Sequence, residues 1–152
     1  MGQVEEKLKS LGIELPEPAK PLAAYIPAKQ TGNLVFTAGQ LPLVDGNLTV
    51  TGHLGKDVEV EAAKAAARVC VINALSAVKG VIGDLDKIKQ IVRVVGYVAS
   101  TPEFTQQPAV VNGASELLLE IFGDSGRHAR SAVGVAVLPL NAAVEVELTV
   151  EI

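Results

Sequence analysis

The sequence is poor in aromatic residues and in cysteine, and it has no excess of basic residues. Aromatic residues make up 3% of the 152 residues, Trp is absent, and the formal net charge is −4. Because phosphate contacts need basic side chains and unpaired bases stack on aromatic rings, we expect no nucleic-acid partner. The single Cys70 excludes an intrachain disulfide, and with only two His residues we expect no metal site. Within its predicted helix, Cys70 is expected to be an inert core residue.

The sequence also has no segment typical of secretion or of a membrane span. The first nine residues are charged and hold no apolar run of the kind a signal peptide needs, and no charge-free apolar stretch reaches the length of a membrane helix. We therefore expect a cytoplasmic protein without a membrane partner. Apolar residues make up 49% and charged residues 20%, which favours one domain over residues 1–152 and indicates that some apolar surface is buried between subunits.

Hydrophobic periodicity and turn residues predict a mixed α+β fold with the order β-β-(β)-α-β-α-β-β. Residues 1–22 are expected to hold a short helix at 3–11 and an extended, Pro-rich arm. The other predicted elements are strands at 23–29, 33–38, 48–51, 88–99, 130–138 and 144–152 and helices at 58–79 and 106–122. Asp57 is the expected N-cap of the longer helix, and Gly80 is its expected end. The crossovers favour a mixed sheet with both of these helices on one face and with the last two strands paired as a hairpin.

Arg130 stands out because it is expected at the mouth of a buried strand. A charge in such a place is costly unless a partner compensates it. A guanidinium binds a planar carboxylate through two parallel hydrogen bonds, so a small organic acid is one candidate partner. An internal salt bridge with an Asp or Glu of the chain is the other, and this segment alone does not decide between them.

Glu145 and Glu147 lie two residues apart on the last predicted strand and therefore share one face. This face is either part of a binding site or an ordinary solvent-facing surface. If the last two strands form a tight hairpin centred between Leu140 and Asn141, Glu145 lies roughly 20 Å from Arg130, at about 3.3 Å per residue. One small ligand cannot contact both side chains over that distance. We therefore expect a neighbouring chain to help to build the pocket.

Several common catalytic motifs are missing. The sequence has no phosphate-binding loop, no Gly-x-Ser-x-Gly, no His-Glu-x-x-His and no Gly-x-Gly-x-x-Gly that opens a helix. His53 and His128 both lie in Gly-flanked loops, so each is expected to be a solvated loop residue. If the strand already includes His128, we expect it to point away from Arg130; otherwise it is simply part of the loop. No cofactor is expected.

Five segments, ordered and with compatible spacing, resemble motifs of the YjgF/RidA family, whose members are also known as endoribonuclease L-PSP and as imine deaminases. The segments are Ala24-Tyr25, Gly32–Pro42, Val111-Asn112, Ala129-Arg130-Ser131, and Leu138-Pro139 with Val144–Glu147. The resemblance covers residues 20–152. The residues before it look like an N-terminal extension, as in a longer subgroup of the family.

The resemblance implies a chorismate-mutase-like fold and a homotrimer with clefts between its subunits. It also implies hydrolysis of reactive 2-imino acids, which derive from enamines, to 2-oxo acids and ammonia. Carried over residue by residue, Arg130 would hold the carboxylate of a small substrate, and Glu145 would position or activate the attacking water. The resemblance also implies a lining or supporting role, partly through backbone groups, for Tyr25, Ala38, Gly39, Asn112 and Ala132.

The sequence departs from the family pattern near these residues. Ala38 replaces a Ser, Ala132 a Cys and His128 a Pro, and the loop between Asn112 and Arg130 is about one residue longer. With two polar side chains replaced, a metabolite-sensing trimer that binds small carboxylates without turning them over is an alternative. A ribonuclease is another alternative, against which the acidic charge argues. A partner-binding or chaperone-like trimer has no distinctive support in the sequence.

Overall fold

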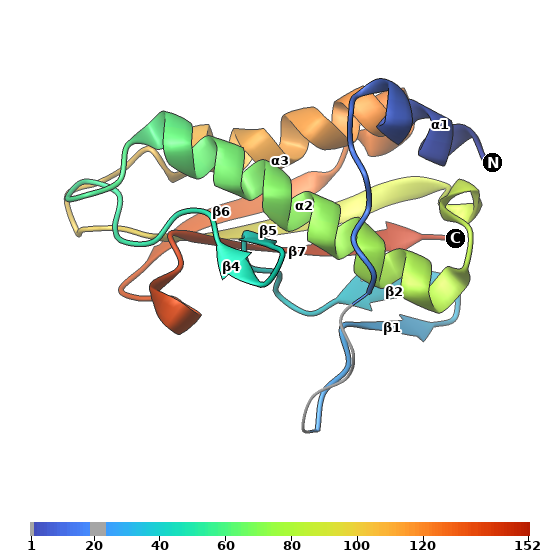
Figure 1. Cartoon of the computed structure of the whole chain (residues 1–152), viewed down its shortest axis with the longest axis horizontal. Coiled ribbons are helices and arrows are strands. Elements are labelled where there is room, and N and C mark those ends of the chain that lie inside the picture. Colours follow the sequence, from blue (N-terminus) through green and yellow to red (C-terminus); the bar gives the residue numbers. More distant parts are fainter. Residues whose placement is uncertain (1, 19–23) are drawn as a thin grey trace.

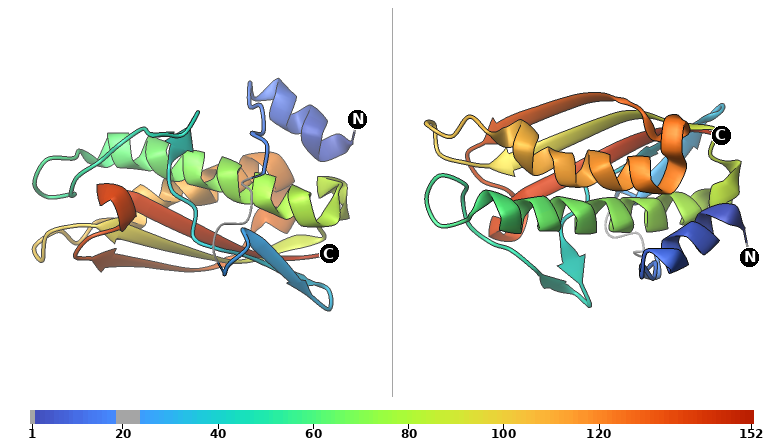
Figure 2. Two further views of the ribbon diagram at one scale, coloured as in Figure 1. Left: turned by 60° about the horizontal axis from the view of Figure 1, so that its bottom comes forward. Right: turned by 90° about the horizontal axis from the view of Figure 1, so that it is seen from above.

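The chain folds into a five-stranded mixed β-sheet and a layer of helices that covers one face of this sheet (Figures 1 and 2). The structure is a computed structural model that describes residues 2–18 and 24–152. The helices are α1 (Gln3–Ser10), α2 (Val60–Ile82) and α3 (Gln107–Phe122), with 3-10 turns η1 (Leu85–Lys87), η2 (Gly123–Gly126) and η3 (Pro139–Asn141). The strands are β1 (Ala28–Thr31), β2 (Leu34–Thr37), β3 (Leu43–Val44), β4 (Asn47–Leu48), β5 (Gln90–Ala99), β6 (Ala129–Val135) and β7 (Val144–Glu151). The predicted α+β fold is confirmed.

The strand order of the main sheet is β1-β2-β7-β5-β6, with β5 parallel to β6 and all other neighbours antiparallel. The predicted hairpin of the last two strands is therefore wrong, because β5 lies between them. After α3 the chain returns parallel to β5, and residues 136–143 then carry it across the end of β5 to the other edge of that strand. Leu140 and Asn141 in this connection have positive φ angles of 58° and 62°, which reverse the chain sharply without pairing β6 to β7.

Helix α2 differs from its prediction at both ends. It begins at Val60, and Asp57 does not cap it; the carboxylate of Asp57 instead accepts a hydrogen bond from the backbone N–H of His53 at 2.6 Å. This hydrogen bond lowers the pKa of Asp57. The helix passes through the expected end and stops one turn later at Gly83, whose φ of 82° is easily adopted only by glycine.

Two short strands also differ from their predictions. Strand β1 begins at Ala28, and residues 19–23, which include the start of the predicted strand, lie outside the described residues. The turn between β1 and β2 lies at Gly32-Asn33 rather than at Gln30–Gly32. A two-residue ladder between β3 and β4 replaces the single strand expected at 48–51.

The core lies between the sheet and helices α2 and α3. The side chains of β7 alternate between this core and the open face of the sheet. Its buried side chains, which face the helices, are Val144, Val146, Leu148 and Val150. Its partly exposed side chains, on the open face, are Glu145, Glu147, Thr149 and Glu151. The helices approach closely at Gly113 of α3, where a Cβ atom would overlap the carbonyl oxygen of Lys64 on α2. Helix α3 also packs against β5 and β6, so it lies over that half of the sheet.

Helix α2 is the one helix of the described chain that is long and apolar enough, by length and composition, to cross a membrane. Its apolar side chains are used in the core, because α2 packs against α3 and β7 and buries residues such as Ala67, Val71 and Leu75. We therefore describe α2 as a core helix of the domain.

Cys70 lies on the buried side of α2 and is fully inaccessible to solvent, in agreement with the predicted core role. Burial, together with the negative charge of Glu145, raises the pKa of the Cys70 thiol well above its ordinary value. We expect a thiol reagent such as DTNB to leave the native protein unlabelled and to react with one thiol per chain in denaturant. Rapid labelling of the folded protein would contradict this packing of α2.

Candidate functional site

Arg130 lies on the edge strand β6, opposite Val94 of β5, and its side chain extends toward helix α3. Its Nη1 donates a hydrogen bond to Asn112 Oδ1 at 2.8 Å and a second one to Ser115 Oγ at 3.2 Å. Both acceptors are neutral. The ion pairs found in residues 2–18 and 24–152 join Lys64 to Glu116, Arg68 to Glu120, Lys79 to Glu5 and Arg127 to Asp124, and none of them involves Arg130.

The two oxygens that hold Arg130 come from one face of α3. Asn112 and Ser115 are three residues apart on this helix, so their side chains lie side by side. The structure thus brings together Arg130 and Asn112, both predicted as site residues. It adds Ser115, which the sequence analysis missed. Its spacing from Asn112 on the predicted helix was the available signal.

His128 is a correction to the sequence analysis. It was expected to be a solvated loop residue or, within the strand, to point away from Arg130, but it is partly buried, and Ser115 Oγ lies 2.8 Å from its Nε2. Its Nδ1 donates to the carbonyl oxygen of Gly126 at 2.6 Å. Residues two apart on an extended strand share a face, so His128 lies on the same side as Arg130.

His53 lies in a loop, as predicted, but its side chain contacts the protein rather than solvent alone. Its side chain is partly buried, and its Nε2 lies 2.7 Å from the carbonyl oxygen of Ala136, in the connection between β6 and β7. Together with the hydrogen bond from its backbone to Asp57, this contact ties the loop before α2 to the end of the sheet.

Glu145 lies on the open face of the sheet, opposite Tyr97 of β5 and next to Glu147 on the same strand. Burial, and to a lesser extent the charge of Glu147, raises the pKa of the Glu145 carboxyl. The segment that contains Ala38 and Gly39 lies against it, because backbone hydrogen bonds of 2.8 and 3.0 Å join Gln40 to Val146. A Cβ atom at Gly39 would overlap the Glu145 carboxylate, so any other residue here would force the Glu145 side chain to move.

The predicted site residues therefore form two groups on opposite faces of the sheet. Arg130 and Asn112 belong to the face covered by helices, and Ala132, opposite Gly96, shares that face. Glu145 belongs to the open face with Ala38 and Gly39. Arg130 and Glu145 are paired with residues three positions apart on β5, about 10 Å along the strand, and the strand itself lies between them. Within one chain they do not line a common space.

Tyr25 contacts neither of these two groups through a hydrogen bond to a residue that the structure describes. Its side chain is 59% exposed and makes no hydrogen bond to a residue that the structure describes. In the same parts of the chain, no group of three or more His, Cys, Asp or Glu side chains is close enough together to hold a metal ion.

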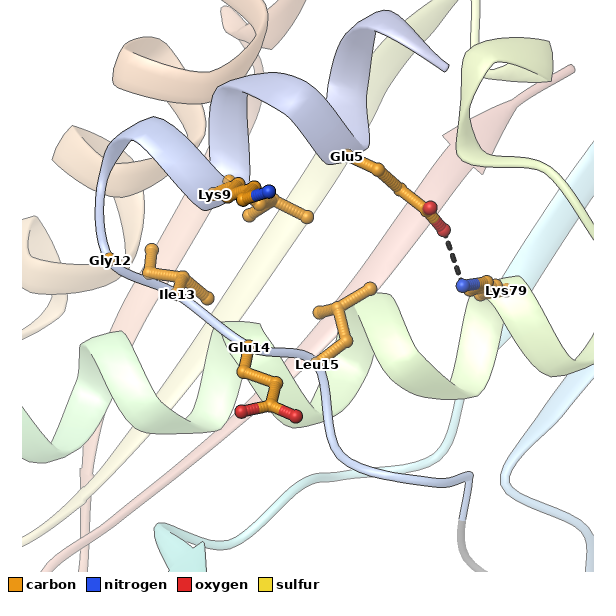
Figure 3. A pocket seen from close by; sticks show the side chains of 8 residues that line it. Glu5, Lys9, Gly12, Ile13, Glu14, Leu15 and Lys79 are labelled. Carbon is orange, nitrogen blue, oxygen red and sulfur yellow. Dashed lines mark ion pairs between the residues drawn. The ribbon is translucent and has the colours of Figure 1, made fainter. Parts of the chain in front are cut away.

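A cavity of about 480 Å³ lies elsewhere, between α1, the segment after it and α2 (Figure 3). Its apolar lining comes from Leu8, Ile13 and Leu15, and the Glu5–Lys79 ion pair closes one side. None of the predicted site residues lines it. It is a surface cleft formed by the N-terminal segment rather than a candidate active site.

Comparison with known proteins decides the family. A profile described as "YjgF/chorismate_mutase-like, putative endoribonuclease" matches residues 5–152. The chain belongs to this family. Protein TCP17 of Trypanosoma cruzi is 45% identical over 152 residues, which cover 99% of this chain and 95% of that protein. A Dermatophagoides farinae protein named 2-iminobutanoate/2-iminopropanoate deaminase is 33% identical over 141 residues, or 92% of this chain and 94% of that one.

Among solved structures, the chain is similar to the protein Atu1372 from Agrobacterium tumefaciens, whose function is described as unknown. The two structures superpose with a TM-score of 0.92, and the sequences are 47% identical. The match covers 99% of this chain and 92% of that chain. The resemblance to YjgF/RidA proteins that the sequence motifs indicated is thus confirmed. That the first residues form an extension of a longer subgroup stays a prediction.

In this YjgF/RidA protein, Glu147 also has a defined partner on the open face. The phenol of Tyr97 donates a hydrogen bond to Glu147 Oε1 at 2.5 Å. This contact, together with burial, raises the pKa of Tyr97 to about 12. The sequence left open that Glu147 lies on an ordinary solvent-facing surface. The structure shows instead that its carboxylate has a specific hydrogen-bond partner.

The Tyr97–Glu147 contact can be tested by alkaline titration of tyrosine absorbance. In a Tyr25→Phe background Tyr97 is the only tyrosine, and we expect it to titrate near pH 12. Glu147→Gln should lower this pKa, because the charged acceptor that stabilises the neutral phenol is lost. Glu151→Gln, on the same face of β7, is the matched control and should leave the titration unchanged. An unaltered curve in the Glu147 variant would show that the contact is not formed.

Proposed function

We propose that the protein hydrolyses reactive 2-imino acids to 2-oxo acids and ammonia in clefts between the subunits of a homotrimer. Arg130 holds the substrate carboxylate, and Glu145 activates water. The observation that carries this proposal is that Arg130 has no acidic partner among residues 2–18 and 24–152. Its guanidinium is half-buried and donates hydrogen bonds to two neutral oxygens, and no Asp or Glu of the described chain forms an ion pair with it. The sequence also allowed an internal salt bridge, but Arg130 forms none with the residues that the structure describes.

The contacts of Arg130 leave its guanidinium able to bind an anion. Asn112 and Ser115 orient the guanidinium but leave its charge uncompensated, and both accept from Nη1. The other N–H groups remain as donors, and a carboxylate can accept two parallel hydrogen bonds from them. A short 2-imino acid carries such a carboxylate next to its reactive carbon.

The environment of Glu145 suits a general base. A raised pKa makes the ionised carboxylate a better proton acceptor, because basicity rises with the pKa of the conjugate acid. In the proposed step, Glu145 takes a proton from water while the water oxygen bonds to the electrophilic iminium carbon. Glu145 then returns this proton to the amino nitrogen of the carbinolamine. As the carbon–nitrogen bond breaks and the carbonyl forms, Glu145 takes the proton of the carbinolamine hydroxyl, so that ammonia and the 2-oxo acid leave and Glu145 releases the proton to ammonia or solvent.

The proposal requires a second subunit, because Arg130 and Glu145 lie on opposite faces of one sheet. A neighbouring copy can supply the missing half if the open face of one chain meets the β6 edge of the next. Exposed apolar side chains on the open face, Phe36 and Val133, each 43% exposed, support such a contact, since apolar surface of this kind is usually covered. The chemistry is supported by the name of the 33% identical Dermatophagoides farinae relative, 2-iminobutanoate/2-iminopropanoate deaminase.

A coupled assay tests the proposal. An amino-acid oxidase generates 2-iminobutanoate or 2-iminopropanoate in the cuvette, and release of the 2-oxo acid and ammonia is followed with and without the protein. We expect catalytic amounts of the protein to accelerate release. Binding of a 2-oxo acid without any acceleration would contradict the proposal and support the metabolite-sensing alternative, for which Ala38 and Ala132 in place of the Ser and Cys motif residues are the specific observation.

A further inference from the structure

We propose that His128 and Ser115 are positioning residues that set the direction of the Arg130 guanidinium and thereby the affinity for the substrate carboxylate. This inference rests on the proposed function for its link to substrate, while the contacts themselves are independent of it. The three side chains form a continuous series in which Arg130 Nη1 lies 3.2 Å from Ser115 Oγ, and Ser115 Oγ lies 2.8 Å from His128 Nε2.

The direction of each hydrogen bond follows from the chemistry of the groups. A carbonyl oxygen only accepts, so His128 Nδ1, 2.6 Å from Gly126 O, carries a hydrogen and donates it. In a neutral imidazole Nε2 is then a bare acceptor, and the Ser115 hydroxyl donates to it. A guanidinium only donates, so Arg130 uses a lone pair of the same hydroxyl oxygen. The protons of all three residues are thereby assigned.

This assignment gives His128 a defined task. By accepting the only hydroxyl proton of Ser115, it turns a lone pair of that oxygen toward Arg130. Without His128, the hydroxyl proton loses its acceptor, and Ser115 can instead donate to a backbone carbonyl one turn earlier on its helix, which moves its oxygen away from the guanidinium. Arg130 would then be held by Asn112 alone and could swing about that one contact. The Pro in the family motif at this position has no side-chain nitrogen, so the arrangement depends on the His of this chain.

The expected effect is on binding rather than on the chemical step. His128→Phe keeps a ring but loses both hydrogen bonds, and Ser115→Ala removes the shared oxygen. Each should raise KM and the Kd for 2-oxobutanoate roughly tenfold, with kcat changed by less than about threefold, because losing a hydrogen bond that positions a charged group weakens ground-state binding and transition-state binding alike. His128→Gln supplies one acceptor and one donor, and Ser115→Thr keeps the hydroxyl, so both should lie closer to wild type. His53→Gln, far from Arg130, is the control.

Histidine tautomers, read from ¹⁵N NMR of the imidazole nitrogens, test the contacts without any reference to activity. With only two histidines in the chain, His53→Gln leaves His128 alone in the spectrum. We expect the Nδ1–H form for neutral His128 and a changed Nε2 shift in Ser115→Ala. An Nε2–H tautomer, or a His128→Phe variant with unaltered KM and Kd, would overturn the inference. A wild type that shows the expected tautomer but neither binds 2-oxobutanoate nor hydrolyses imines would instead overturn the proposed function.

Discussion

Replacing Arg130 by Ala is expected to lower kcat/KM for 2-iminobutanoate by about two to three orders of magnitude and to leave the fold intact. The charged, hydrogen-bonded contact to the substrate carboxylate is lost, and truncating one partner of such a pair costs about 2–5 kcal/mol. Because the carboxylate is held in the ground state and in the transition state alike, most of the loss should be in KM. The thermal midpoint should change little, since the two side chains released, Asn112 and Ser115, lie near the sheet edge and can bind water.

Two further variants serve as controls for Arg130→Ala. Arg127→Ala removes a positive charge three residues away, from an exposed pair with Asp124, and should leave kcat/KM unchanged. Arg130→Lys keeps the charge but not the planar pair of donors, and it should fall between wild type and Ala. Activity of Arg130→Ala within a few-fold of wild type would remove the basis of the proposed function.

Replacing Glu145 by Gln is expected to lower kcat by about two to four orders of magnitude while 2-oxobutanoate still binds, because general base catalysis typically contributes that much. The variant should be at least as stable as wild type near neutral pH. A carboxyl whose pKa is raised by folding contributes stability only at low pH, and that stability is lost as the pH rises through the folded-state pKa. At neutral pH the ionised Glu145 is therefore a cost that Gln removes.

The pH profile gives the same prediction a second readout. Because burial, together with the charge of Glu147, raises the pKa of Glu145, the acid limb of kcat/KM should lie above the range where an ordinary Glu titrates. Glu147→Gln should move this limb to lower pH, since the like charge is removed. Glu151→Gln on the same strand is the control for both readouts. A Glu145→Gln variant with wild-type kcat would assign the proton transfer to another group.

The sequence predicted the elements well because each rests on local information. The apolar alternation of β7, the Pro near the start of α3 and Gly123 after its end are all readable without tertiary structure. Strand pairing is not local. The hairpin of the last two strands was wrong because β5, which ends at Ala99 and is separated from β6 by the whole of α3, takes the place between them.

The same distinction applies to the site. Arg130 and Glu145 were candidates from the residues themselves, whereas Asn112 and Gly39 came only from the family resemblance. The structure groups Arg130 with Asn112 and Glu145 with Gly39. The contact of His128 with Ser115 was missed, although the two-residue spacing of His128 and Arg130 already put them on one side of a strand. Asp57 was predicted as a helix cap because its type and position fit, but the backbone N–H of His53, four residues earlier in the same loop, binds its carboxylate instead.

The central claim is tested most directly by a crystal structure of the assembled protein soaked with 2-oxobutanoate. We expect the carboxylate of this product to accept two hydrogen bonds from Arg130, in a cleft that a neighbouring subunit completes with Glu145 within reach of the keto carbon. A guanidinium engaged by an Asp or Glu of a neighbouring subunit, with no ligand before it, would contradict the account.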